Sequence, residues 1–92
     1  MSLNNTEKKV SSMELQENYK ILSFDPDQIC TDLGLSSHEL KNTLHIGLTT
    51  NPTTVWKLRD YMEEKILQQG KTPYPYSILK NNIYFLYTKN WD

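Results

Sequence analysis

Residues 25–46 read DPDQICTDLGLSSHELKNTLHI, and this stretch decides the fold that the sequence predicts. It holds two short segments with apolar residues at helical spacing, and Gly34 separates them. Glycine adopts the left-handed conformation that ends a helix without a steric clash at Cβ. The sequence therefore predicts a helix over residues 26–33, a turn at Gly34 and a second helix over residues 37–46.

Both of these helices are preceded by a capping signal. Asp25 comes directly before Pro26, which suits an N-cap followed by a first-turn residue that needs no amide hydrogen. Ser36 stands three residues before Glu39, which is the spacing of a capping box. The two signals fix where each helix begins.

The pattern around Gly34 is typical of a helix-turn-helix. Such a unit needs a small residue where the two helices cross, a glycine at the turn and apolar anchors on either side. Cys30 is the small residue and Leu40 is the anchor in the second helix. Thr43 departs from the pattern, because an apolar residue is usual there, although Leu44 stands next to it. The other expected core positions are Ile29, Leu33 and Leu35.

Two further helices are predicted, over residues 12–22 and 52–69. The first follows Ser11, which has capping-box spacing to Glu14, and the second follows an Asn-Pro pair. The longer helix carries its apolar stripe on Val55, Leu58, Met62 and Ile66, with Trp56 and Leu67 beside it. The predicted fold class is mainly α, a four-helix compact domain that contains a helix-turn-helix.

We expect a flexible tail over residues 1–10 and a single domain over residues 11–92, helical as far as residue 70. Residues 71–92 form a Pro- and aromatic-rich C-terminal segment, in which the two prolines exclude a helix near its start. Two arrangements remain open for the rest. Residues 76–80 and 83–87 pair as a β-hairpin around two asparagines, or the first stretch forms one helical turn followed by an extended edge strand.

Composition excludes several classes of protein. The 92 residues carry a net charge of −1, and the three glycines all follow helix-like segments, which leaves none for a phosphate-binding loop. The longest apolar run, residues 83–87, is too short for a membrane helix. A single cysteine and the lack of an apolar stretch in the first nine residues favour a reducing cytoplasm. We expect no enzyme, no metal site and no cofactor.

A DNA-reading surface is predicted on the outer face of the helix over residues 37–46. Lysine reaches guanine acceptors, asparagine pairs with adenine, and serine holds phosphate. The candidate residues for duplex DNA are Ser36, Ser37, His38, Lys41, Asn42 and His45. Charge opposes this interpretation, because residues 25–48 hold four acids against one lysine, a balance of −3. Residues 71–92 have a balance of +2, which suits a wing on the phosphate backbone or a lysine-guarded edge strand.

Three sharper interpretations compete with ordinary packing. His38 and His45 share a helix face but lack a third metal ligand beside them. Cys30 is expected to pack at the helix crossing rather than to act as a redox thiol. The C-terminal aromatic residues are either a stacking platform for single strands or part of the packing over the helix of residues 52–69 or against a second chain. These rings are Tyr74, Tyr76, Tyr84, Phe85, Tyr87 and Trp91.

Several segments resemble a known family. They are similar to segments of short bacterial proteins of unknown function. The segments are MSLNNTE at residues 1–7, ELQENY at residues 14–19, WxLRxY at residues 56–61 and, above all, QGKTPYPYxxLK at residues 69–80. That group is assigned a lambda-repressor-like helix-turn-helix. The resemblance implies a compact bacterial domain of this type, with no catalytic residues to carry over, and it departs from the family at residues 83–86.

Two hypotheses for function follow. The first is a cytoplasmic helix-turn-helix protein that binds duplex DNA as a transcriptional regulator. The second is a non-catalytic protein-interaction or dimerisation domain on the same scaffold, without DNA affinity. A homodimer is expected in either case, because the apolar and aromatic surface exceeds what four short helices cover.

Overall fold

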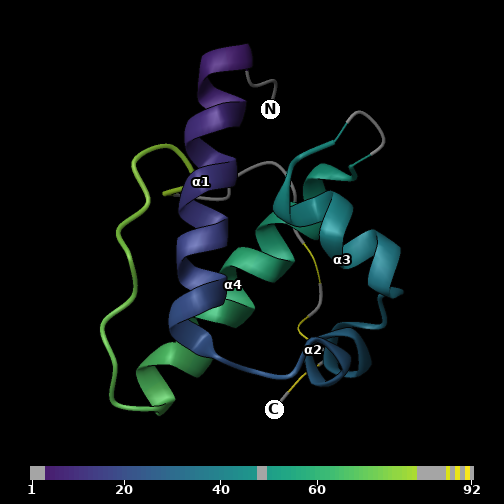
Figure 1. Cartoon of the computed structure of the whole chain (residues 1–92), viewed down its shortest axis with the longest axis vertical. Coiled ribbons are helices and arrows are strands. Elements are labelled where there is room, and N and C mark those ends of the chain that lie inside the picture. Colours follow the sequence, from purple (N-terminus) through teal and green to yellow (C-terminus); the bar gives the residue numbers. More distant parts are fainter. Residues whose placement is uncertain (1–3, 48–49, 81–86, 88, 90, 92) are drawn as a thin grey trace.

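The computed structural model describes residues 4–47, 50–80, 87, 89 and 91. Within them the chain forms four helices and no strand: α1 (Asn5–Leu22), α2 (Pro26–Leu33), α3 (Ser37–Leu44) and α4 (Pro52–Gln68). Figure 1 shows α1 packed across α4, with α2 and α3 together on one side of this pair. The mainly helical, compact architecture is confirmed.

The start of α1 differs from the prediction. Asn4 caps the helix, and its Oδ1 accepts from the Glu7 amide at 2.8 Å while Glu7 Oε1 accepts from the Asn4 amide at 3.1 Å. This capping box lies seven residues before the one that we expected at Ser11. The prediction of a flexible tail over residues 1–10 is therefore wrong for residues 5–10, which are helical, and residues 1–3 lie outside the described residues.

The bend between α2 and α3 is built as predicted. Gly34 has φ of +69°, and its amide donates to the Cys30 carbonyl, so α2 ends there. The Leu35 amide also donates to the Cys30 carbonyl, at 2.9 Å, which closes the corner before Ser36 caps α3. Residues 26–46 are consequently two crossing helices (Figure 1).

The ends of the other two predicted helices need small corrections. α3 stops at Leu44 rather than at residue 46, because Ile46 adopts φ of +47°, outside the helical region. α4 stops one residue before the predicted residue 69. The predicted bounds of α2 are confirmed.

All four helices contribute to one apolar core. It includes Ile29 and Leu33 of α2, Leu40 of α3, and Leu15 and Leu22 of α1, and α2 packs on α3 as α1 packs on α4. Thr43 is buried in spite of its hydroxyl, which donates to the Glu39 carbonyl at 2.7 Å and so needs no other partner. From α4 come Val55, Trp56, Leu58, Tyr61, Met62 and Ile66, whereas Leu67 is exposed.

Residues 71–80 run back along α1 in the opposite direction (Figure 1). Two polar side chains of α1 hold them. The buried Asn18 donates from Nδ2 to the Tyr74 carbonyl at 3.0 Å and accepts from the Tyr74 amide at 2.8 Å. One turn earlier, both Glu14 carboxylate oxygens accept from Ser77, with its hydroxyl at 2.9 Å. Ser11 and Glu14 therefore lie inside the helix, and Glu14 serves the C-terminal segment instead of a cap.

The predicted hairpin is not formed in its first half. Residues 76–80 contain no strand and no helical turn, and the Lys80 amide donates to the Ile78 carbonyl in a tight bend. Leu79 is buried, and its carbonyl accepts from Arg59 Nε at 2.8 Å. Most of the second half, residues 83–86, lies outside the described residues.

We predict that Asn18→Ala lowers the free energy of unfolding by about 1–3 kcal/mol, because it leaves the amide and carbonyl of Tyr74 without their partner. Urea denaturation measures the change. Gln68→Ala at the exposed end of α4 is the control and is expected to change stability by less than about 0.5 kcal/mol. An Asn18→Ala variant as stable as the wild-type chain contradicts this account.

Candidate nucleic-acid interface

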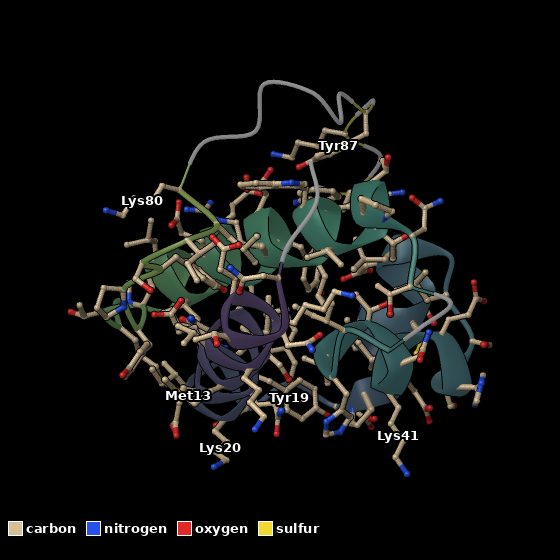
Figure 2. The ribbon with its side chains drawn as sticks, turned by 90° about the horizontal axis from the view of Figure 1, so that it is seen from above. Met13, Tyr19, Lys20, Lys41, Lys80 and Tyr87 are labelled. Carbon is tan, nitrogen blue, oxygen red and sulfur yellow. The ribbon has the colours of Figure 1, made fainter. Side chains whose placement is uncertain are left out.

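The helix α3 presents three exposed polar side chains to solvent: Ser37, His38 and Lys41. They share one face because residues three and four apart return to the same side of a helix. Figure 2 shows Lys41 projecting away from the body of the molecule. These three predicted site residues are placed where an approaching ligand can reach them.

Ser36 has a structural role at the start of the same helix. Its hydroxyl oxygen accepts from the Glu39 amide at 3.1 Å, and the Glu39 carboxylate accepts from the Ser36 amide at 3.0 Å. The capping box predicted from the sequence is confirmed. Ser36 therefore positions α3, and its side-chain oxygen is already engaged.

Asn42 is half-buried and turned toward the loop that follows α3. A Cβ placed on Gly47 would lie 2.0 Å from Asn42 Oδ1, so a larger residue at position 47 would require the Asn42 side chain to move. The Asn42 carbonyl accepts from the Gly47 amide and from the Thr50 hydroxyl, each at 3.0 Å. The main-chain carbonyl of Asn42 therefore holds the end of α3 against the loop, and the predicted role of its side chain in reading adenine stays a prediction.

His45 lies at the C-terminal end of α3, where it meets α1. Its Nδ1 is 3.4 Å from Gln16 Nε2, and the Ser12 hydroxyl donates to the Leu44 carbonyl at 2.9 Å. Gln16 Nε2 also donates to the Ser12 hydroxyl at 2.9 Å. These contacts join the outer surfaces of the two helices.

A shallow groove of about 320 Å³ lies over α1 beside His45. Its charged lining comes from three lysines and one acid: Lys8, Lys9, Lys20 and Glu17. Figure 2 shows Lys20 and Lys41 on the same side of the molecule. A sequence prediction that places residues 1–10 in a tail cannot contain this groove. The Asn-x-x-Glu pattern at residues 4–7 is the signal that extends α1 over Lys8 and Lys9, but it does not place α1 beside His45.

Most acids of the α2–α3 unit are engaged within the protein. Asp25 accepts from the Asp27 amide at 2.9 Å as the N-cap of α2, as predicted. Asp32 accepts from the Tyr61 hydroxyl at 2.5 Å and from Gln28 Nε2 at 2.9 Å. With Glu39 in its capping box, three of the four acids have structural partners. These partners are neutral groups, so the formal balance of −3 remains.

Cys30 is partly buried against the core, less deeply than the expected packing residue. Burial raises the pKa of its thiol, and the nearby charges of Asp27 and Glu39 raise it further. A thiol in such a site reacts slowly, because the thiolate is the nucleophile. Among the described residues, no group of three His, Cys, Asp or Glu side chains could hold a metal ion.

The described C-terminal aromatic residues pack onto the protein. Trp91 is buried, with its ring edge-on to Tyr61 at 5.6 Å and stacked on Tyr87 at 5.9 Å. Its indole N–H donates to Glu64, and the Tyr87 hydroxyl donates to Asp60. Tyr76 is buried under the Arg59 guanidinium, Tyr74 is exposed, and Tyr84 and Phe85 lie outside the described residues.

Residues 1–90 match the bacterial family described as "Uncharacterized protein conserved in bacteria (DUF2316)". The chain belongs to this family. No curated protein and no solved structure matches the chain. Within the described residues, no helix of this family member combines the length and apolar character needed to cross a membrane.

We predict that Cys30 of the folded chain reacts with Ellman's reagent at pH 8 more slowly than in urea, because its pKa is raised by burial and by Asp27. Asp27→Asn removes one of the nearby negative charges and should speed the reaction on the order of twofold. Glu17→Gln on α1 removes a distant charge and is the control. An unchanged reaction rate in Asp27→Asn contradicts the statement that the charge of Asp27 raises the pKa of Cys30.

A second prediction concerns the Glu64 carboxylate, which accepts a hydrogen bond from the indole of Trp91. Hydrogen bonds from Lys89 and Trp91 hold the pKa of Glu64 below its usual value. Because the pKa is lowered, the hydrogen bonds to the Glu64 carboxylate stabilise the fold fully at pH values above the ordinary glutamate pKa. This stabilisation is lost as the pH falls through the lowered pKa of Glu64. The indole N–H resonance of Trp91 should therefore stay constant from pH 7 down and move only below about pH 4.3.

Glu64→Gln is the control for this titration, because a neutral side chain removes the acid-dependent step. In that variant the Trp91 resonance should not titrate in this range. A resonance that moves near pH 6 in the wild-type chain contradicts the contact.

Proposed function

We propose that the chain is a helix-turn-helix protein that binds duplex DNA as a transcriptional regulator, with α3 entering the major groove. The observation that carries the proposal is the exposed set Ser37, His38 and Lys41 on the helix that follows the left-handed corner at Gly34. A recognition helix contacts base edges with its N-terminal residues. Ser37 and His38 lie in the first turn of α3, and Lys41, although it belongs to the last turn, lies on the same face.

The chemistry of the three side chains supports the proposal. Lys41 can donate to the acceptors of guanine, and Ser37 to a base edge or a phosphate oxygen. α2 packs on α3, and Ile29, Leu33 and Leu40 belong to the buried core, which leaves the exposed face of α3 free to meet a ligand. A second copy of the chain, as expected from the sequence, would supply a second α3 for the adjacent half-site.

A protein-interaction role without DNA affinity is the second candidate. A groove of about 370 Å³ lies between α4 and residues 73–80, and two large apolar side chains beside it, Leu67 and Tyr74, are 59% and 37% exposed. Exposed apolar side chains that line one groove favour contact with another protein surface.

Titration of a labelled mixed-sequence duplex, followed by fluorescence anisotropy at about 50 and 200 mM salt, separates the candidates. We predict micromolar or tighter binding at the lower salt, which weakens at the higher salt. Lys41→Gln should weaken binding about fivefold or more, since a lost base contact costs about 1–3 kcal/mol.

Lys80→Gln is the matched control, because Lys80 is exposed and lies far from Lys41 in Figure 2. Equal losses in Lys41→Gln and Lys80→Gln would mean that α3 is not the contact helix. Absence of binding by the wild-type chain at low salt contradicts the DNA proposal and favours the interaction role.

A further inference from the structure

The outer face of α1 carries a regular basic stripe. Lys8, Ser12, Gln16 and Lys20 follow one another at intervals of four, and Lys9, Met13 and Glu17 form a parallel row. Residues four apart lie above one another on a helix, so both rows face the same side. Together with His45 of α3 they line the groove of about 320 Å³.

The positive charge of this face is poorly neutralised. Lys9 and Lys20 are exposed, and Lys20 has one loose ion pair, 3.8 Å from the partly exposed Glu17. Within the described part of the chain, no ion pair involves Lys8 or Lys9. Such exposed pairs contribute little, so the lysines can exchange them for another anion at small cost.

The remaining acids of α1 do not line the groove. Glu14 is buried on the side that faces residues 71–80 and is bonded to Ser77. Glu7 is engaged in the capping box with Asn4. The helix therefore has an inner side that binds the C-terminal segment and an outer side that is basic.

The basic groove continues the outer surface of α3. Ser12 bonds the Leu44 carbonyl and Gln16 contacts His45, so the two helices are tied where their outer surfaces meet. Lys20 and Lys41 project to the same side (Figure 2). A duplex that approaches α3 from this side also approaches α1.

We propose that the α1 groove binds the phosphate backbone of the same duplex that α3 reads. This inference rests on the DNA-binding function proposed above and adds a second contact helix to it. Lys8 and Lys20 are twelve residues apart, which is about 18 Å along the helix. That length covers roughly five base-pair steps of 3.4 Å, enough for several phosphates. Ammonium groups bind phosphate as point charges without reading sequence, so α1 supplies affinity while α3 supplies selectivity.

The test compares two variants with equal net charge. Lys9→Gln/Lys20→Gln removes two lysines from the groove, and Lys57→Gln/Lys80→Gln removes two lysines from α4 and the segment after it, which do not line the groove. Anisotropy titrations over a salt series, with two unrelated duplex sequences, measure the affinity and the slope of log K against log salt. Thermal unfolding of each variant verifies that the fold is retained.

We expect Lys9→Gln/Lys20→Gln to weaken binding about tenfold or more and to reduce the salt slope by about 1.8, since each phosphate contact contributes about 0.9. The loss should be equal for both duplexes, unlike that of Lys41→Gln. The control variant should keep most of the wild-type affinity and slope.

Two outcomes overturn the inference in distinguishable ways. In the first, the wild-type chain binds DNA, but Lys9→Gln/Lys20→Gln leaves the salt slope unchanged or the control variant loses as much affinity. This outcome removes α1 from the interface and leaves the proposed function standing. Absence of wild-type binding at low salt contradicts the proposed function and this inference together.

Discussion

The amide of Asn18 is the contact on which the arrangement of the chain depends. Residues 71–80 contain two prolines and cannot form a helix, so their backbone groups need partners from elsewhere. Asn18 gives Tyr74 a donor and an acceptor at once, and the Glu14 carboxylate, one turn away, accepts from the amide and hydroxyl of Ser77. Because both side chains are buried, these bonds fix which side of α1 is covered and which faces solvent.

These bonds give α1 two different sides. On its inner side α1 packs on α4 and holds the C-terminal segment, while on its outer side it carries lysines and joins α3 through Ser12 and Gln16. α2 acts as a support that sets α3 at an angle through the Gly34 corner. The proposed DNA surface therefore combines a short helix that is rigidly held and a longer one that supplies charge.

Sequence reasoning predicted the parts of this fold that depend on local chemistry. The Gly34 turn, the Asp25 and Ser36 caps and the bounds of α2 follow from side chains within a few residues of each other, and each is confirmed. The start of α1 was missed because Asn4 and Ser11 both stand three residues before a glutamate, and only the tertiary contact of Glu14 with Ser77 separates the two. Periodicity places Asn42 on the outer face of α3, but its proximity to Gly47 depends on the course of the loop and cannot be predicted from spacing. The basic groove needs the relative placement of α1 and α3, which no local pattern contains.

The central claim is that duplex DNA contacts α3 and the outer side of α1, while the C-terminal segment covers the inner side of α1. The most direct test is a map of backbone amide shifts, recorded by two-dimensional NMR as duplex DNA is added to the whole chain. The account predicts that the amides of Lys9, Lys20, His38 and Lys41 move together while those of Tyr74 and Ser77 stay in place. Shifts concentrated on α4 and residues 71–80, with α1 and α3 unmoved, would contradict it.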